Sequence, residues 1–424
     1  MVVAAGNTAK AQTERKMTVD ELFQLVESNS KTLQTEKISV EFAQKGIEVA
    51  RTARLPELSA SASVSMNGDV FVTDRDFSHV KGFAAPRWGN SLALEAQQVV
   101  YAGGAIDAGI RLADLQLQQA NVGTEQRRQQ QRFLALGQYL EIFKLRNREQ
   151  VLQKNIELTG RLIDDIKAKH EQGMALRNDV TRYELQMETL RLNLKKLQDQ
   201  RSILNHQLCN QLCVEGEIVP DNRLLDAVEA QESENSWQAT ALTASPDIRQ
   251  MEIQQQMAQQ ELKLAKSEML PKVAVVAADN FSGPFTYDLP PVDKNINYWY
   301  VGIGVKYPIS SLFKQNKKVH QAQIRTRQAQ KAHEVAAEQL NNQVQQAWTY
   351  YQQAFVELET QQKSVELAGQ NYQVVNERYL SQLALITDMI DASNTKLNAE
   401  LQEVDARINI VYAYYRLRYA AGTL

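Results

Sequence analysis

The sequence lacks any long hydrophobic segment. Its longest purely apolar run, Val273–Ala278, has six residues, whereas a membrane-spanning helix needs about 20. No segment is therefore expected to cross a bilayer as a helix, so a membrane role would have to use strands. The charges also nearly balance, at a formal net charge of -3. This balance gives no reason to expect nucleic acid as a partner.

Cysteine and histidine are scarce. Metal ligation at Cys209 and Cys213 would need further ligands, so we interpret them as small apolar residues one turn apart on a helix. The five histidines are scattered, and we find no nucleophile elbow or phosphate-binding loop. The sequence predicts no enzyme, no catalytic or metal site and no cofactor.

The N-terminus carries an incomplete export signal. Ala9-Lys10-Ala11 would serve as a signal-peptidase site before Gln12, but no apolar core precedes it. We interpret residues 1–16 either as the remnant of a signal peptide or as a disordered leader. No cysteine follows the Ala-x-Ala triplet, so the leader gives no indication of a lipid anchor.

Two long proline-free runs of helix-forming residues dominate the rest. They extend from Gly104 to Gln172 and from Lys314 to Ser381, and each would form a helix of about 100 Å. A break and a second helix follow each run, with turns at Gly173 and near Gln382. The first returning helix has an apolar seam at steps of three and four, typical of a coiled coil: Val180, Tyr183, Met187, Leu190, Leu194, Leu197, Arg201, Leu204 and Leu208.

Two pairs of strands are expected between the helices. In residues 57–66, apolar side chains alternate with mostly serine, which predicts a strand with one apolar and one polar face. A returning strand is expected at 88–101, after a long loop. A second pair is expected near 272–279 and 298–307. If these strands enter a membrane, Ala62 faces lipid and Ser61 faces the lumen.

The chain reads as a duplication with an offset of 215 residues. Leu55-Pro56 aligns with Leu270-Pro271, and Ser245 stands where Ser30 stood. We predict a first repeat at 17–213, a linker at 214–236 that has lost the helical period, and a second repeat at 237–424. Because four strands cannot close into a membrane barrel, a membrane role requires several copies of the chain.

The duplicated pattern resembles the outer membrane efflux protein family typified by TolC. The resemblance covers residues 17–424 and rests on motifs in order: Leu-Pro before the first strand of each half, VVYAGG before the first long helix, EQGMALRNDV and RYLSQLALITDMIDA at the two turns, and AAGTL at the C-terminus. It implies a mainly α fold class with a transmembrane β-hairpin pair. The expected assembly is a homotrimer with a 12-stranded β-barrel, a 12-helix periplasmic tunnel and an equatorial belt formed by the linker.

The same resemblance implies an outer membrane channel of a Gram-negative bacterium, the exit duct of a tripartite efflux or type I secretion system. The implied partners are a periplasmic adaptor (membrane fusion) protein, an inner-membrane transporter of RND or ABC type, and outer membrane lipid. Asp388 and Asp391 match aspartates that ring the closed periplasmic entrance, and Gly173 and Gln382 mark partner-docking turns. From the residues alone, the helix dipole is the favoured explanation of acidic residues in a first helical turn, and the resemblance reverses that order.

Three features depart from the family pattern. Gln382 replaces the usual glycine of the second turn, Gln315-Asn316 stand where the first half has Gly103-Gly104, and the export signal is incomplete. Two other classes stay open at this point. A periplasmic coiled-coil adaptor normally has one hairpin per chain, and a coiled-coil scaffold would need neither an exported leader nor amphipathic strands.

Overall fold

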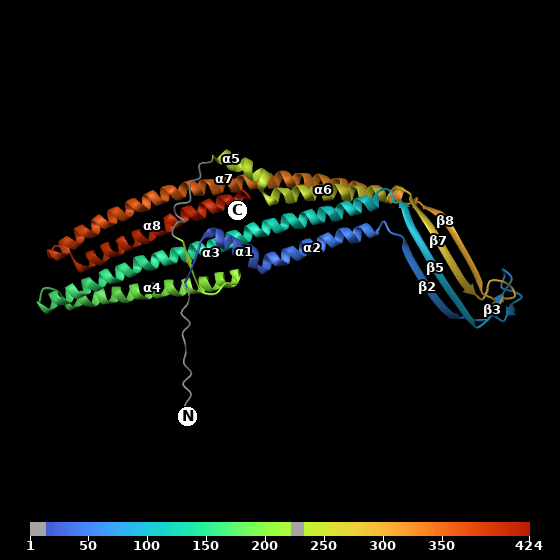
Figure 1. Cartoon of the computed structure of the whole chain (residues 1–424), viewed down its shortest axis with the longest axis horizontal. Coiled ribbons are helices and arrows are strands. Elements are labelled where there is room, and N and C mark those ends of the chain that lie inside the picture. The colour runs from blue at the N-terminus through green and yellow to red at the C-terminus, as the bar shows by residue number, and fades with distance from the viewer. Residues whose placement is uncertain (1–13, 222–232) are drawn as a thin grey trace, which may run out of the picture. The chain divides into compact units, whose positions relative to one another are not determined.

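A computed structural model describes residues 14–221 and 233–424 of this mainly helical chain (Figure 1). The described residues divide into two units. Unit 1 holds residues 14–38, 122–221, 233–250 and 334–424, and unit 2 holds 39–121 and 251–333. The Ala9-Lys10-Ala11 triplet lies outside the described residues, and the boundaries predicted for leader, repeats and linker remain a prediction.

The first repeat begins with two helices, continues through strands and ends in a helical hairpin. Its elements are β1 (Glu14–Met17), α1 (Val19–Asn29), α2 (Lys31–Thr52), β2 (Glu57–Met66), β3 (Val70–Val72), β4 (Lys81–Phe83), β5 (Trp88–Tyr101), α3 (Ala105–Glu171) and α4 (Arg177–Leu212). The predicted strands and long helices are confirmed to within a few residues. The short strands β1, β3 and β4 were not expected.

The second repeat follows the same order. Its elements are β6 (Glu217–Pro220), α5 (Glu234–Ala244), α6 (Pro246–Ser267), β7 (Lys272–Gly283), β8 (Ile296–Lys306), α7 (Ser311–Leu380) and α8 (Ile386–Ala420). The helices α5 and α6 and the strand β7 each begin 215 residues after α1, α2 and β2, which confirms the predicted offset. The strand β6 lies within the segment predicted as linker and pairs in parallel with β1.

A buried serine separates the first two helices of each repeat. The N–H of Ser30 donates to the carbonyl of Val26 at 3.1 Å and ends α1, while its hydroxyl accepts from the N–H of Leu33 in α2. Ser245 ends α5 in the same way and accepts from the N–H of Asp247 at 3.2 Å. A serine side chain thus satisfies a free N–H at the start of the next helix.

One antiparallel sheet in the order β2-β5-β7-β8 joins the two repeats, since β5 pairs with β7 (Figure 1). Directly opposite residues share a face, so the register defines an apolar face: Leu58, Ala60, Ala62, Val64, Met66, Leu92, Leu94, Ala96, Val275, Ala277, Phe281, Trp299, Val301, Ile303 and Val305. The opposite, polar face carries the serines of β2 and Glu95, Gln97 and Asn280. Asn90, Gln98, Asp279 and Asn297 interrupt the apolar face, and β7 and β8 place Ala278 and Tyr300 on the opposite face, so the two-sided pattern is clearest in β2.

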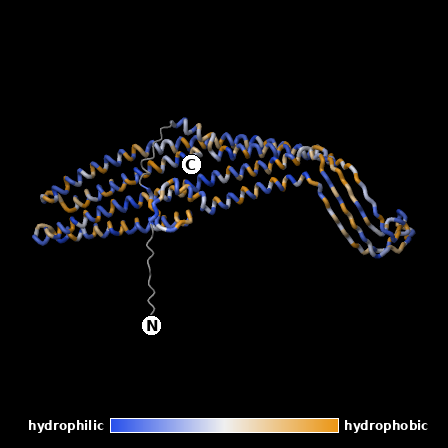
Figure 2. The backbone as a smooth tube through the Cα atoms, in the orientation of Figure 1, coloured by the Kyte–Doolittle hydropathy of each residue, from blue (hydrophilic) through white to orange (hydrophobic). Residues whose placement is uncertain are grey.

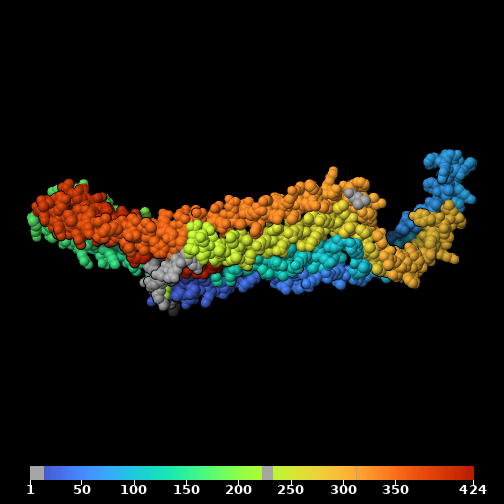
Figure 3. Space-filling model, turned by 90° about the horizontal axis from the view of Figure 1, so that it is seen from above, coloured from blue at the N-terminus to red at the C-terminus, as the bar shows by residue number. Residues whose placement is uncertain are grey.

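In unit 2, α6 lies beside the N-terminal part of α7 (Figures 1 and 3). Arg325 of α7 pairs with Glu261 of α6 at 3.0 Å, and the hydroxyl of Thr326 donates to the carbonyl of Ala258 at 3.4 Å. Apolar residues recur at short intervals along the helices, between hydrophilic ones (Figure 2). Within the described residues, no helix has the length and apolar character to cross a membrane.

Unit 1 contains the main hydrophobic core, which gathers α1, α3, α4, α5, α7 and α8. Tyr139 of α3 is fully buried, and its hydroxyl donates to the carbonyl of Met17 at 2.6 Å and accepts from the N–H of Asp221 at 3.1 Å. These bonds hold the paired strands β1 and β6 against the long helix. Burial raises the pKa of Tyr139 far above its usual value.

Two expectations are corrected. Gln315 and Asn316 lie inside α7 rather than in a turn, because the strand β8 ends at Lys306 before Pro308 and the helix already begins at Ser311. The residues between strand and helix in the second repeat are thus 307–310. Cys209 is buried on α4 as expected, but Cys213 is exposed and follows the helix in a left-handed conformation, at φ 52°.

Candidate functional site

The two helical hairpin turns have the same backbone geometry. At the first turn, the N–H of Gly173 donates to His170 at 2.9 Å and that of Met174 donates to Lys169 at 2.8 Å. At the second, Gln382 donates to Tyr379 at 3.1 Å and Leu383 donates to Arg378 at 2.7 Å. Both are Schellman caps, which satisfy free carbonyls at a helix end with a left-handed residue.

The left-handed residue is glycine in one turn and glutamine in the other. Gly173 has φ 74° and Gln382 has φ 61°. A residue with a Cβ rarely adopts this conformation, which costs it roughly 1–2 kcal/mol. The missing glycine at Gln382 has therefore not altered the shape of the turn.

An aspartate begins the returning helix after each turn. The N–H of Leu176 donates to the carboxylate of Asp179 at 3.3 Å, and the N–H of Leu385 donates to that of Asp388 at 3.0 Å. Asp388 thus has a capping partner of its own, as the helix-dipole explanation requires.

Asp391 has no counterpart in the first turn. The spacing of 209 residues that relates Asp179 to Asp388 relates Arg182 to Asp391. Asp388 and Asp391 are both exposed, three residues apart on α8, whereas Met389 and Ala392 beside them are buried. The two carboxylates therefore lie on one exposed side of the helix, which is the placement a cation-binding surface needs.

A hydrophobic cluster under the turns joins the two hairpins. It consists of Ile163, Ile166, Val180, Tyr183, Met187, Tyr372, Ile386, Met389 and Ala392. The ammonium of Lys169 lies 5.4 Å from the ring centre of Tyr379, and Gln186 donates to Asn394 at 2.6 Å. These contacts between α3, α4, α7 and α8 place the turns marked by Gly173 and Gln382 at the same end of the two hairpins.

The cluster contains a buried hydroxyl. Burial, and then the neighbouring Tyr379 and Tyr372, raise the pKa of Tyr183 far above its usual value, so this side chain stays neutral at physiological pH. Its hydroxyl has no hydrogen-bond partner in the described part of the chain. Hydrophobic packing rather than polar pairing therefore holds Tyr183 in place.

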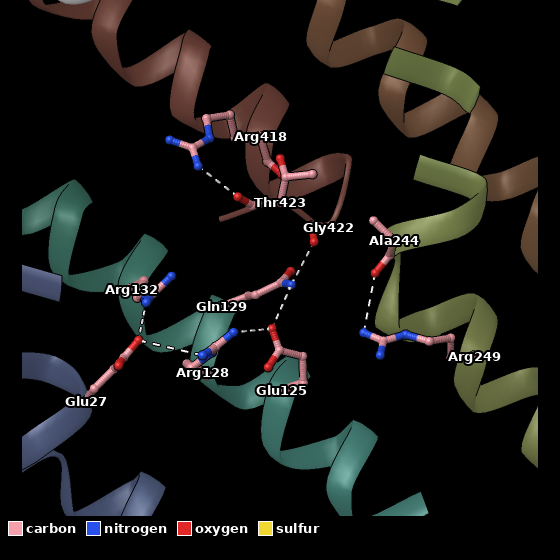
Figure 4. A network of polar contacts seen from close by, with 10 residues as sticks. All are labelled: Glu27, Glu125, Arg128, Gln129, Arg132, Ala244, Arg249, Arg418, Gly422 and Thr423. Atoms are coloured by element: carbon pink, nitrogen blue, oxygen red, sulfur yellow. Dashed lines mark hydrogen bonds and ion pairs between the residues drawn. The ribbon is translucent and has the colours of Figure 1, made fainter. Parts of the chain in front are cut away.

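A second polar assembly, unforeseen from the sequence, surrounds the C-terminal motif in unit 1 (Figure 4). Glu27 of α1 pairs with Arg128 and Arg132 of α3. Gln129 donates to the carbonyl of Gly422 at 2.8 Å. The AAGTL motif thus closes against α3, and its glycine is required because a Cβ at Gly422 would lie 2.7 Å from the Cα of Ser245. The AAGTL motif was recognised in the sequence. The ion pairs of Glu27 in α1 with Arg128 and Arg132 in α3 join residues about 100 positions apart, so no local pattern predicts them.

No grouping of three or more metal-ligating side chains occurs within residues 14–221 and 233–424. The geometry so far defines a duplicated helical-hairpin protein with a two-faced sheet, a class that suits a membrane channel.

Comparisons with known proteins agree with that class. Residues 237–423 match the family model described as "Outer membrane efflux protein". The chain is 21% identical to the outer membrane efflux protein BepC of Brucella suis over 406 residues, covering 93% of this chain and 83% of BepC.

Solved structures give the same fold. The outer membrane protein VceC of Vibrio cholerae matches with a TM-score of 0.75 at 16% identity, over 95% of this chain and 96% of VceC. The Campylobacter jejuni CmeC outer membrane channel matches with a TM-score of 0.76 at 15% identity, over 96% of this chain and 85% of CmeC.

The second repeat thus matches the outer membrane efflux protein family model, and the chain as a whole is similar to members of that family in sequence and fold. These likenesses support an outer membrane location for the chain, with a large periplasmic part. Its relatives are channel proteins rather than enzymes.

Proposed function

We propose that three copies of this chain form the exit duct of a tripartite efflux or type I secretion system. The duct carries substrates from an inner-membrane pump, of RND or ABC type, across the periplasm and the outer membrane. A periplasmic adaptor joins the pump to the duct at the hairpin turns marked by Gly173 and Gln382.

The two-faced sheet is the observation that carries this proposal. Its apolar face suits lipid and its serine-rich face suits water. Its outer strands, β2 and β8, have no further partner among the described residues. Since open edges are not tolerated in lipid, copies must pair β8 with β2 until the sheet closes, and three copies give twelve strands. A coiled-coil adaptor or scaffold would not need this sheet.

The periplasmic gate is proposed at Asp388 and Asp391. Both carboxylates are exposed on α8 beside the second turn. Threefold symmetry would bring six of them together at the axis, where their combined negative potential attracts cations. Their repulsion opposes closure, so closure rests on the packing of neighbouring helices. The exposed Asp391, which has no acidic counterpart in the first turn, is the stronger candidate of the two.

The test combines assembly with conductance. The protein is extracted from outer membranes in detergent and is expected to run as a heat-sensitive trimer that forms channels in planar bilayers. Asp388→Asn combined with Asp391→Asn should lower cation preference and weaken block by trivalent cations from the periplasmic side. The amide still accepts the capping hydrogen bond, so the helix start is preserved.

Asp179→Asn is the matched control, because Asp179 caps the other hairpin in the same way. It should leave selectivity and block unchanged. A monomer without channel activity would overturn the proposed duct. A normal channel whose selectivity and block do not respond to the double substitution would overturn only the gate.

A further inference from the structure

The apolar face of the sheet contains a hollow. Two rows of directly opposite residues form it: Leu58, Ala96, Ala277 and Val301 in one row, and Ala60, Leu94, Asp279 and Trp299 in the next. The small alanines lie low between large, exposed neighbours, and the space they leave is about 500 Å³. A depression of this size and character fits part of a hydrocarbon chain.

Asp279 breaks the apolar pattern at the rim of this hollow. The register pairs it with Leu94 on one side and Trp299 on the other, so it shares the apolar face with them. In the first repeat, 215 residues earlier, the same position is Val64. The carboxylate is therefore a feature of the second repeat only.

Asp279 lies at the level along the strands where we expect the lipid headgroups. The aromatic residues Trp88, Phe281 and Trp299 all lie toward the ends of β5, β7 and β8 that adjoin the long loops. Such aromatic residues form girdles at headgroup level in membrane sheets. A charge there costs only about 0–1 kcal/mol, whereas at the midplane a basic charge costs ~2–4 kcal/mol.

The carboxylate is free to bind a ligand. Within the described residues, no side chain hydrogen bonds to Asp279 or pairs with it. Glu95 adjoins Leu94 along β5 and so faces the opposite way. A divalent metal would find one protein carboxylate where it takes about six oxygen ligands. An ammonium group needs only one carboxylate to accept its hydrogen bond.

We propose that the hollow binds one acyl chain of a membrane lipid whose headgroup carries a primary ammonium, such as a phosphoethanolamine lipid. Asp279 accepts a hydrogen bond from that ammonium, and Trp299 packs along the lipid. The inference rests on the proposed function in one respect, that the apolar face contacts lipid.

Trp299 allows a direct test by fluorescence quenching. The full-length trimer is placed in vesicles that mix phosphatidylethanolamine and phosphatidylcholine, with bromine on the acyl chains of either one. The Trp299 signal is taken as the difference from Trp299→Phe. Quenching should favour brominated phosphatidylethanolamine about two- to fivefold over its share of the mixture, the range expected for an exposed ion pair.

Variants separate the two parts of the site. Asp279→Asn should abolish the preference, so that each brominated lipid quenches in proportion to its share of the mixture. Ala277→Leu, which fills the hollow, should reduce quenching by both lipids. Ala93→Leu, on the polar face opposite Ser61 and Asn280, should not.

Each outcome has a distinct meaning. Absence of quenching by either lipid would overturn the lipid-facing assignment and with it the proposed duct. Equal quenching by both lipids, a preference that survives in Asp279→Asn, or a preference that EDTA abolishes would overturn the ammonium site alone.

Discussion

The two repeats reach the same structure with different residues, and the hairpin turns make the contrast sharpest. Both turns are Schellman caps followed by an aspartate that caps the returning helix. The first uses Gly173 at the left-handed position and the second uses Gln382. The surrounding helices therefore determine the conformation of the turn. The residue at the left-handed position changes only the free energy needed to adopt it. Where the two repeats have the same backbone but different residues, the residue that differs is a candidate for a role other than folding.

The largest expected effect concerns the faces of the sheet, which both repeats share. Ala62 in β2 and Ala277 in β7 occupy the same repeat position on the apolar face. Ala62→Arg and Ala277→Arg should each reduce the yield of folded trimer. The effect should be larger for Ala277→Arg, because Ala277 lies farther from the loop ends and a basic charge on the lipid side costs ~2–4 kcal/mol near the midplane but only about 0–1 kcal/mol near the interfaces. Heat-sensitive trimer in extracted membranes is the readout.

Ser61→Arg is the matched control on the polar face. It should assemble nearly as well as the unsubstituted protein, since that face meets water. Equal tolerance of arginine at positions 61 and 62 would show the strand faces to be wrongly assigned.

A smaller effect is expected from exchanging the turn residues. Gly173→Gln should lower the free energy of unfolding by about 1 kcal/mol, because glutamine must then adopt φ 74°. Gln382→Gly should raise it by less, since glycine also gains freedom in the unfolded chain. Urea unfolding of the purified protein measures both. If Gln382→Gly also lowered the free energy of unfolding, as Gly173→Gln is expected to do, the side chain of Gln382 would be making stabilising contacts.

The smallest effect concerns the helix caps. Asp179→Ala and Asp388→Ala should each cost about 0.5 kcal/mol of unfolding free energy, because each removes one partner of a free N–H. Asp391→Ala should cost nothing measurable by the same urea titration. A large destabilisation in Asp391→Ala would give that residue a structural role and weaken its assignment to the gate.

The sequence predicted the long elements because periodicity is strongest there. The apolar seam of α4 and the alternation in β2 extend over many residues, so the expected ranges match the structure closely. The repeat offset added independent support, since α5, α6 and β7 follow it without a shift.

The short strands and the roles of individual side chains could not be predicted from the local sequence. β1 and β6 have four residues each and pair across two hundred residues of chain, so neither has a pattern by itself. Gln315 was matched to Gly103 by order alone, although Pro308 and the early start of α7 place it within a helix. Asp388 was recognised as a candidate, but its hydrogen bond to Leu385 depends on the turn geometry.

The pairing of β5 with β7 has a consequence for how such a duct could have arisen. It joins the end of one repeat's strand pair to the start of the next, whereas β2–β5 and β7–β8 are joints within a repeat. In the proposed assembly, β8 of one copy meets β2 of the next, which is again a joint between a second strand and a first. A ring of three chains then contains six β-hairpins related by pseudo-sixfold symmetry. Three of the joints between repeats lie within one chain, and the other three lie between chains. Duplication of an ancestral single-repeat gene would have required no new kind of interface, only freedom for the two halves to diverge, as Val64 and Asp279 have done.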